Sequence, residues 1–207
     1  MPTLALPKDG DLDEEPDEAL VRALKENQSD APRAVWDRFS PMVRRIARRT
    51  LGPVSDAEDL VQDVFMQLFA KVHTLREPRV LKAFIISITT LTLRRELRRR
   101  KLRSWLGLRP DPLAVDLRVV HPDPIGRAAL ERFYQVLDRL DARERTAFAL
   151  RYIEGLPLND VASALGVSLA TAKRSLAHAQ RRVLLHVERD PLLVDYLAQA
   201  LGEAKNG

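Results

Sequence analysis

The protein has 207 residues, of which 45% are hydrophobic, so it can form a core. It has no cysteine, which excludes a disulfide scaffold, an iron–sulfur cluster and a cysteine-ligated zinc site. Its 34 Lys and Arg outnumber its 29 Asp and Glu, and the formal charge of +5 is compatible with an anionic partner such as nucleic acid and equally with a merely solvated basic surface. The four histidines, His73, His121, His178 and His186, are scattered, so neither a metal site nor a cofactor is expected.

The sequence shows no targeting or membrane segment. Residues 1–10 contain no basic stretch followed by an apolar run. The longest apolar-leaning run without charge, residues 83–93, is too short for a bilayer, which requires ~20 residues. We therefore expect a cytoplasmic protein. Residues 1–18 hold seven Asp and Glu against one Lys, which predicts a flexible acidic arm over residues 1–16.

Apolar residues recur at helical spacing, and no alternating pattern is long enough to predict a sheet. The first half is predicted to form helices over 17–27, from about 30 to 52, from 55 to about 72 and from about 79 to 103. Pro32 suits the first turn of the second helix, whereas Pro41 should kink or restart it. The sequence Ser55-Asp56-Ala57-Glu58 is a capping box that begins the third helix.

Residues 104–126 contain four prolines and no periodic pattern, so they are predicted to be a flexible linker. Helices resume at about residue 127. A second capping box covers Asp141 to Glu144, Gly155 suits a helix end, and residues 191–207 form a short amphipathic tail. The expected fold is therefore all-α, with two small helical domains over residues 17–103 and 127–190.

A helix-turn-helix is predicted over residues 158–188. Gly166 supplies the positive φ of the turn, Ser168 caps the second helix, and Leu169, Ala172 and Leu176 face inward. In such a unit the N-terminal part of the second helix enters the major groove of DNA. A plain helical hairpin with a solvated basic face is the alternative. The residues expected to contact DNA are Ser168, Thr171, Lys173, Arg174, Ser175 and His178.

Two surfaces of opposite charge are expected in the first half. Residues 94–103 carry seven Arg and Lys, for which a nucleic-acid backbone is the natural counter-charge; a basic but merely solvated helix end is the alternative. The helix that begins at Ser55 carries acids along one edge beside apolar residues expected to be exposed. This pattern suits a basic protein partner, and an ordinary core helix is the alternative. Its candidate contact residues are Asp56, Glu58, Asp59, Gln62, Asp63, Phe65 and Met66.

Residues 56–65, D-A-E-D-L-V-Q-D-V-F, resemble a signature of bacterial RNA polymerase sigma factors. Residues 152–156, Y-I-E-G-L, and residues 160–168 resemble the second conserved domain of the extracytoplasmic-function (ECF) group. The similarity covers roughly residues 17–103 and 127–188, in the expected order. These ranges would correspond to sigma regions 2 and 4.

The resemblance implies a protein that binds core RNA polymerase through the 56–66 surface and directs promoter-specific initiation, without catalysis or a cofactor. The recognition helix would read the −35 element, and the loop and helix over residues 73–103 would read and melt the −10 element, so the partners include double-stranded and melted promoter DNA. An anti-sigma protein is a further partner that the family implies. Aromatic and basic groups suit unstacked bases. The −10 candidates are Lys82, Phe84, Arg94, Arg95, Arg98 and Arg99.

The sequence departs from the family pattern at several positions. The long helix has Phe84, Leu91 and Arg95 where the family usually has Trp, Asn and Asp, and Ser175 and Gln180 alter the basic pattern of the recognition helix. These departures indicate an unusual promoter or a weaker −35 contact. They also leave open a polymerase-binding competitor that does not read promoters. A stand-alone helix-turn-helix regulator would give residues 56–65 no role, and no nucleophile–base pair or phosphate loop supports an enzyme.

Overall fold

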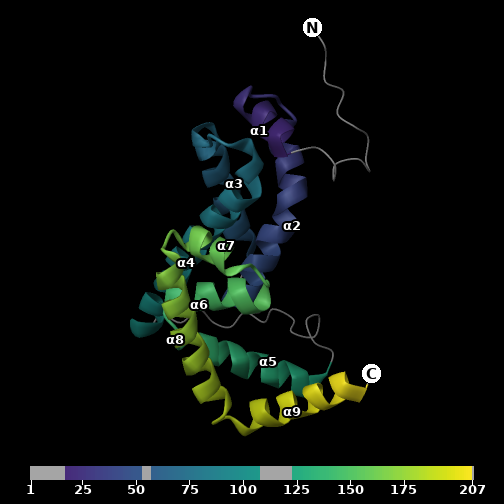
Figure 1. Ribbon diagram of the computed structural model, residues 1–207, viewed down its shortest axis with the longest axis vertical. Coiled ribbons are helices and arrows are strands. Elements are labelled where there is room, and N and C mark those ends of the chain that lie inside the picture. The colour runs from purple at the N-terminus through teal and green to yellow at the C-terminus, as the bar shows by residue number, and fades with distance from the viewer. Residues whose placement is uncertain (1–16, 53–56, 108–122, 207) are drawn as a thin grey trace.

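The computed structural model describes residues 17–52, 57–107 and 123–206, and these residues form helices without any strand (Figure 1). The all-α prediction is confirmed. The acidic arm, part of the first capping box and most of the predicted linker lie outside the described residues. None of the described helices has the length and apolar character required to cross a membrane.

The first half contains α1 (Asp17–Lys25), α2 (Ala31–Leu51), α3 (Ala57–Lys71) and α4 (Leu81–Trp105), with short 3-10 turns at Val72–Thr74 and Pro78–Val80 between α3 and α4. Pro32 lies in the first turn of α2, as predicted. The predicted restart at Pro41 is wrong, because α2 continues through it as one helix. Pro41 lies on the exposed face of α2, so the carbonyl that loses its partner there can bind water while the opposite face stays packed.

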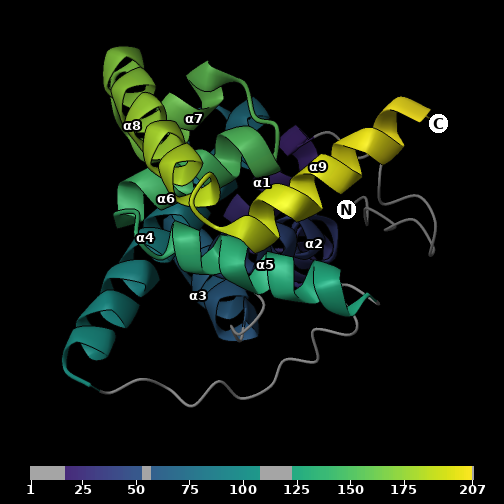
Figure 2. The same ribbon diagram turned by 90° about the horizontal axis from the view of Figure 1, so that it is seen from below.

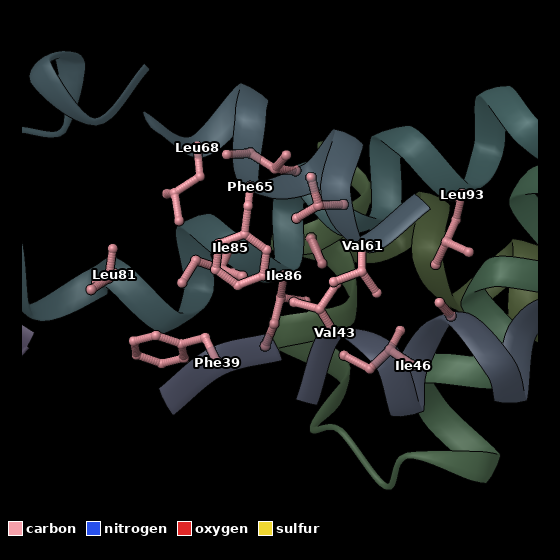
Figure 3. Packing of buried hydrophobic residues seen from close by; sticks show 14 of the residues in the cluster. Phe39, Val43, Ile46, Val61, Phe65, Leu68, Leu81, Ile85, Ile86 and Leu93 are labelled. Carbon is pink, nitrogen blue, oxygen red and sulfur yellow. The ribbon is translucent and has the colours of Figure 1, made fainter. Parts of the chain in front are cut away.

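The core of the first half lies between α2, α3 and α4. Phe39, Val43 and Ile46 on α2 face Phe65 on α3 and Ile85 on α4, and all five are buried (Figure 3). The aromatic rings of Trp36 and Phe65 lie 4.6 Å apart between centroids. This packing sets which faces of α3 and α4 remain outward.

The second half contains α5 (Pro124–Leu137), α6 (Ala142–Phe148), a π-helical turn at Ala149–Ile153, α7 (Leu158–Leu165), α8 (Leu169–Val187) and α9 (Pro191–Asn206). α5 begins three residues before the predicted start, because Asp123 caps it by accepting a hydrogen bond of 2.6 Å from the Gly126 backbone N–H. At the other edge of the predicted linker, α4 continues two residues beyond residue 103. The predicted domain boundaries stay a prediction.

The two halves pack against each other. The hydrophobic cluster that contains the α2–α4 core also contains Leu150, Val161, Ala164, Leu165 and Leu176 from the second half. α6 and α7 thereby pack on α4, and the π-helical turn at Ala149–Ile153 packs on α2 (Figure 1). A second cluster, built from α5, α6, α8 and α9, closes the far side of the second half.

Candidate functional site

The predicted acidic surface follows one outward stripe of α3. Glu58, Asp59, Gln62, Asp63 and Met66 are all exposed, and Met66 is 63% exposed. These positions recur every three to four residues and therefore share one side of the helix. Asp56, also predicted for this surface, lies outside the described residues.

Phe65 does not belong to this stripe. It is 2% exposed and its ring packs on Trp36 and, at 5.9 Å between centroids, on Phe69. The prediction that Phe65 is exposed is wrong, because it lies on the side of α3 that faces α2. The helical spacing of the apolar residues shows that α3 has a wide apolar face, but it does not show which residues of that face are buried.

Glu58 differs from its neighbours because it is held within the first half. Its carboxylate accepts hydrogen bonds from Arg44 Nε and Nη2 at 2.7 and 2.9 Å, and Arg48 Nη2 lies 3.3 Å away. The hydrogen bond from Arg44 lowers the pKa of Glu58 from its ordinary value. Within the described part of the chain, Asp59 and Asp63 form no ion pair, so their charges face outward.

The basic residues of α4 divide into two groups. Lys82, Arg95, Arg98 and Arg99 are exposed, as expected for a surface that meets an anionic partner. Arg94 is partly buried and donates from Nη1 to the backbone carbonyl of Leu165 in the second half, at 3.4 Å. Burial lowers the pKa of Arg94.

Phe84 is half-buried and packs on the edge of the core. Its ring is therefore held in place by the first half and only partly presented to a partner. Further along α4, Glu96 gathers Arg99, Arg100 and Arg103, with N–O distances of 2.7, 2.8 and 3.3 Å. This one carboxylate offsets part of the positive charge of α4.

The helix-turn-helix forms as predicted. Gly166 ends α7 in the left-handed region, at φ +64°, where a glycine avoids the strain that a side chain would introduce. Ser168 caps α8, and its Oγ accepts from the Thr171 backbone N–H at 3.2 Å. Val161, Ala162, Ala172 and Leu176 are buried between the helices, whereas Leu169, expected to face inward, is exposed.

The outer face of α8 presents most of the predicted DNA-contacting side chains. Ser168, Lys173, Arg174 and His178 are exposed, and Thr171 and Ser175 are half-buried. Arg174 Nη2 lies 3.5 Å from Thr171 Oγ1, so these two side chains are neighbours on that face. The turn brings Lys173 and Arg174 to the second turn of the helix, the part that reaches base edges in a helix-turn-helix.

His178 and Arg182 are held by a carboxylate from α6. Glu144 is hydrogen-bonded to His178 Nδ1, lies 3.5 Å from Arg182 Nη1, and also accepts from the Asp141 backbone N–H at 3.1 Å. The Asp141–Glu144 capping box is therefore confirmed, and its glutamate also fixes the middle of α8. His178 is exposed, but its ring is held by Glu144. The sequence pattern did not indicate this contact.

Arg145 joins the two halves at the end of α2. Its guanidinium donates from Nε to the Thr50 carbonyl at 2.7 Å and from Nη2 to the Leu51 carbonyl at 3.0 Å, and its Nη1 is bonded to Asp138. The last carbonyls of a helix lack intrahelical partners and carry partial negative charge. Arg145, 4% exposed, therefore caps α2 from the other half of the chain.

Glu154 provides a second polar contact between the halves. Its carboxylate, 2% exposed, lies 2.9 Å from Arg45 Nε and 3.4 Å from Arg49 Nη1 on α2. Beside it, Tyr134 donates from its hydroxyl to the Arg49 carbonyl at 3.2 Å. Sequence reasoning missed the contacts of Arg145, Glu154 and Tyr134 with the first half, because those partners lie 85 to 109 residues away along the chain.

Each half of the chain matches a known protein-family model. Residues 35–103 match the model of Sigma-70 region 2, and residues 130–183 match that of Sigma-70, region 4. The first match covers most of α2 to α4, and the second covers most of α5 to α8. Both charged surfaces of the first half therefore lie within the first matched segment, and the helix-turn-helix lies within the second except for the last residues of α8.

Comparison with individual proteins gives the same result. The chain is 30% identical over 144 residues to the ferric citrate uptake sigma factor FecI of Escherichia coli, covering 66% of this chain and 79% of FecI. It is 32% identical over 166 residues to the probable ECF RNA polymerase sigma factor SigI of Mycobacterium tuberculosis, covering 75% of this chain and 55% of SigI. The solved structure of the sigma factor RpoE from Bartonella quintana, in complex with the anti-sigma factor NepR, is 25% identical with a TM-score of 0.56, covering 78% of this chain and 99% of RpoE.

Proposed function

The chain belongs to the extracytoplasmic-function family of RNA polymerase sigma factors, and we propose that it binds core RNA polymerase and directs promoter-specific initiation through the surfaces described above. The observation that carries this function is the pairing of an outward acidic stripe on α3 with a helix-turn-helix, one in each half. We further propose that the protein acts in the cytoplasm and has no catalytic activity of its own.

Run-off transcription with purified bacterial core polymerase and a genomic fragment library tests the function directly. We expect transcripts that depend on this protein and share an upstream motif, which also supplies the promoter. Binding of core polymerase without such transcripts would identify a competitor. Operator binding without polymerase binding would identify a stand-alone regulator.

We place the polymerase contact on the stripe of Asp59, Gln62, Asp63 and Met66. Two outward carboxylates beside an exposed thioether suit a basic partner surface with an apolar patch. Glu58 contributes less, because Arg44 already neutralises it. Phe65 contributes indirectly, because its packing on Trp36 holds α3 against α2.

Replacing both Asp59 and Asp63 by asparagine is expected to weaken core-polymerase binding roughly tenfold, because two interfacial charges are lost while the side-chain shape is kept. Fluorescence anisotropy of labelled protein titrated with core polymerase measures the change. The double variant Glu188→Gln/Asp195→Asn removes the same charge from two exposed positions, one directly after α8 and one on α9, and should bind normally. Equal affinities of the two double variants would contradict the assignment.

We place the −35 contact on Ser168, Thr171, Lys173, Arg174 and Ser175, with His178 oriented by Glu144. Lys173 and Arg174 are the exposed cations nearest the N-terminus of α8, where phosphates and base edges are both within reach. The −10 contact is placed on the exposed cations of α4, Lys82, Arg95, Arg98 and Arg99, beside the half-buried Phe84. Arg94 joins them once its contact with Leu165 is released.

Replacing Lys173 and Arg174 by alanine is expected to weaken binding of the holoenzyme to its promoter and to reduce its salt dependence. Each lost phosphate contact should lower the slope of log K against log salt by about 0.9. Promoter affinity measured at several salt concentrations tests this. The control variant Lys71→Ala/Arg189→Ala removes the same charge from exposed positions elsewhere and should keep the slope of the unmodified protein. A Lys173/Arg174 variant with the same slope as this control would argue against the contact.

Reading both promoter elements at once requires the halves to separate. The −10 and −35 elements lie about 25 base pairs apart, or roughly 85 Å at 3.4 Å per base pair. In the structure, Arg94 of the −10 surface touches Leu165, one residue before the turn of the helix-turn-helix. We therefore propose that the packed arrangement is a state of the free protein that opens on the polymerase.

We also propose an anti-sigma protein as a partner, supported by the likeness to RpoE in its complex with NepR. Such a partner should bind both halves while they are packed. A stoichiometric complex recovered with the tagged chain from its native host, and dissolved when core polymerase is added, is the expected result. A complex that survives excess core polymerase would contradict competition for the same surfaces.

A further inference from the structure

The first turn of α8 exposes two apolar side chains that none of the contacts assigned above uses. Leu169, the first residue of the helix, is 40% exposed, and Ala170 beside it is also exposed. The sequence predicted that Leu169 faces inward, but within the described residues it belongs to neither hydrophobic cluster. Figure 2 shows α8 at the edge of the molecule, with the end away from α9 pointing outward. Leu169 is therefore open to a partner that approaches the N-terminal end of α8.

The polar groups of the same turn are partly committed to one another. Ser168 Oγ accepts from the Thr171 backbone N–H at 3.2 Å and lies 2.9 Å from Thr171 Oγ1, in a hydrogen bond between the two hydroxyls. Thr171 Oγ1 also lies 3.5 Å from Arg174 Nη2. The surface that this turn leaves for a partner is thus mostly apolar, whereas the cations follow one turn later.

We propose that Leu169 reads a thymine of the −35 element by packing on its 5-methyl group, with Ala170 beside it in the same groove. The N-terminal residues of a recognition helix meet base edges in the major groove. The base edges there present hydrogen-bonding groups, and the thymine methyl is the one apolar group among them. The inference rests on the proposed function and adds to it the identity of one base, which the cations of α8 do not supply.

The position of Leu169 favours this contact over the alternatives. A lone exposed leucine on a solvated surface requires no partner. Leu169, however, lies one turn before Lys173 on the same flank of α8, so DNA that meets Lys173 also comes within reach of Leu169. A protein seated on Leu169 would respond to its truncation whatever the DNA sequence, whereas a methyl contact responds to a single base.

Removal of single methyl groups from the promoter tests the inference. In the promoter recovered by run-off transcription, each thymine of the −35 element is replaced in turn by deoxyuridine, which lacks only the 5-methyl group. Uracil at one position should weaken binding of the holoenzyme roughly fourfold, the effect of one buried methyl group. The same replacement should have no effect on Leu169→Ala, because the methyl then has no partner, and Leu169→Met should retain most of the effect. Alanine favours an exposed helical position, so Leu169→Ala should fold.

Leu184→Ala is the matched control, because it truncates an exposed leucine of the same helix about 22 Å from Leu169 along the axis. Its ratio of affinities for the thymine and uracil promoters should equal that of the unmodified protein, and any effect on assembly with polymerase cancels in this ratio. A −35 element without thymine, uracil that changes affinity at no position, or a uracil effect that persists in Leu169→Ala would overturn the inference. Promoter-specific binding that ignores uracil rejects only the role of Leu169, whereas loss of promoter-specific binding in every preparation rejects the sigma function.

Discussion

Replacing Arg145 by alanine is expected to lower the free energy of unfolding by about 2–4 kcal/mol, because the carbonyls of Thr50 and Leu51 lose their donors in a buried site. The guanidinium is the only side chain that the described structure places on both carbonyls at the end of α2. Burial lowers the pKa of Arg145, with Asp138 acting in the opposite direction. The hydrogen bonds of the guanidinium thus offset the free-energy cost of burying its charge.

Urea unfolding followed by circular dichroism measures this effect. Arg143→Ala is the matched control, since Arg143 lies two residues earlier on the same helix and is exposed. The control should change stability by no more than about 0.5 kcal/mol. An Arg145→Ala protein as stable as the control would show that water replaces the guanidinium without loss.

Replacing Glu154 by arginine is expected to part the two halves. The substitution places a third cation against Arg45 and Arg49 in a site where the native carboxylate is 2% exposed. Arg45 and Arg49 are each about half exposed, so the two lost ion pairs and the new repulsion between like charges should together cost at least about 1.4 kcal/mol, which lowers the ratio of packed to open protein by about tenfold or more. Each half keeps its own helices, so the circular dichroism spectrum should change little.

Energy transfer between two dyes measures the separation. The natural chain has no cysteine, so cysteines introduced at the exposed positions Lys71 and Glu188 label both halves selectively. Transfer should fall in Glu154→Arg and return when Arg45 and Arg49 are both changed to glutamate in the same protein. Glu131→Arg, an equal charge change at an exposed position of α5, should leave transfer unchanged. If the triple change fails to restore transfer, the ion pairs do not hold the halves together.

The local features of the fold were predictable because they depend on residues close together in the chain. Asp141 and Glu144 form a capping box, the Ser168 side chain accepts a hydrogen bond from the Thr171 backbone N–H, and Gly166 adopts the positive φ of the turn without strain. No distant contact is needed for any of these. The restart expected at Pro41 failed because the buried face of α2 supports the helix across the missing hydrogen bond.

The candidate sites were predictable to the level of a helix face and no further. A stripe of acids on α3 and of cations on α4 and α8 follows from spacing alone. The position of α2 decides which edge of the apolar face of α3 is covered. It therefore decides that Phe65 is buried while Met66 is exposed. Likewise, the pairing of His178 with Glu144 depends on α6 crossing α8.

The sequence by itself therefore determined most of the helices, the caps at Asp141 and Ser168, the helix-turn-helix and the family. The tertiary structure alone decided how the halves meet: Arg145 on the end of α2, Glu154 between two arginines, and Arg94 against Leu165. The physical reason is sequence separation. Capping and periodicity act over three or four residues, whereas these contacts join residues 71 to 109 positions apart, where only the packed fold brings a donor to its acceptor.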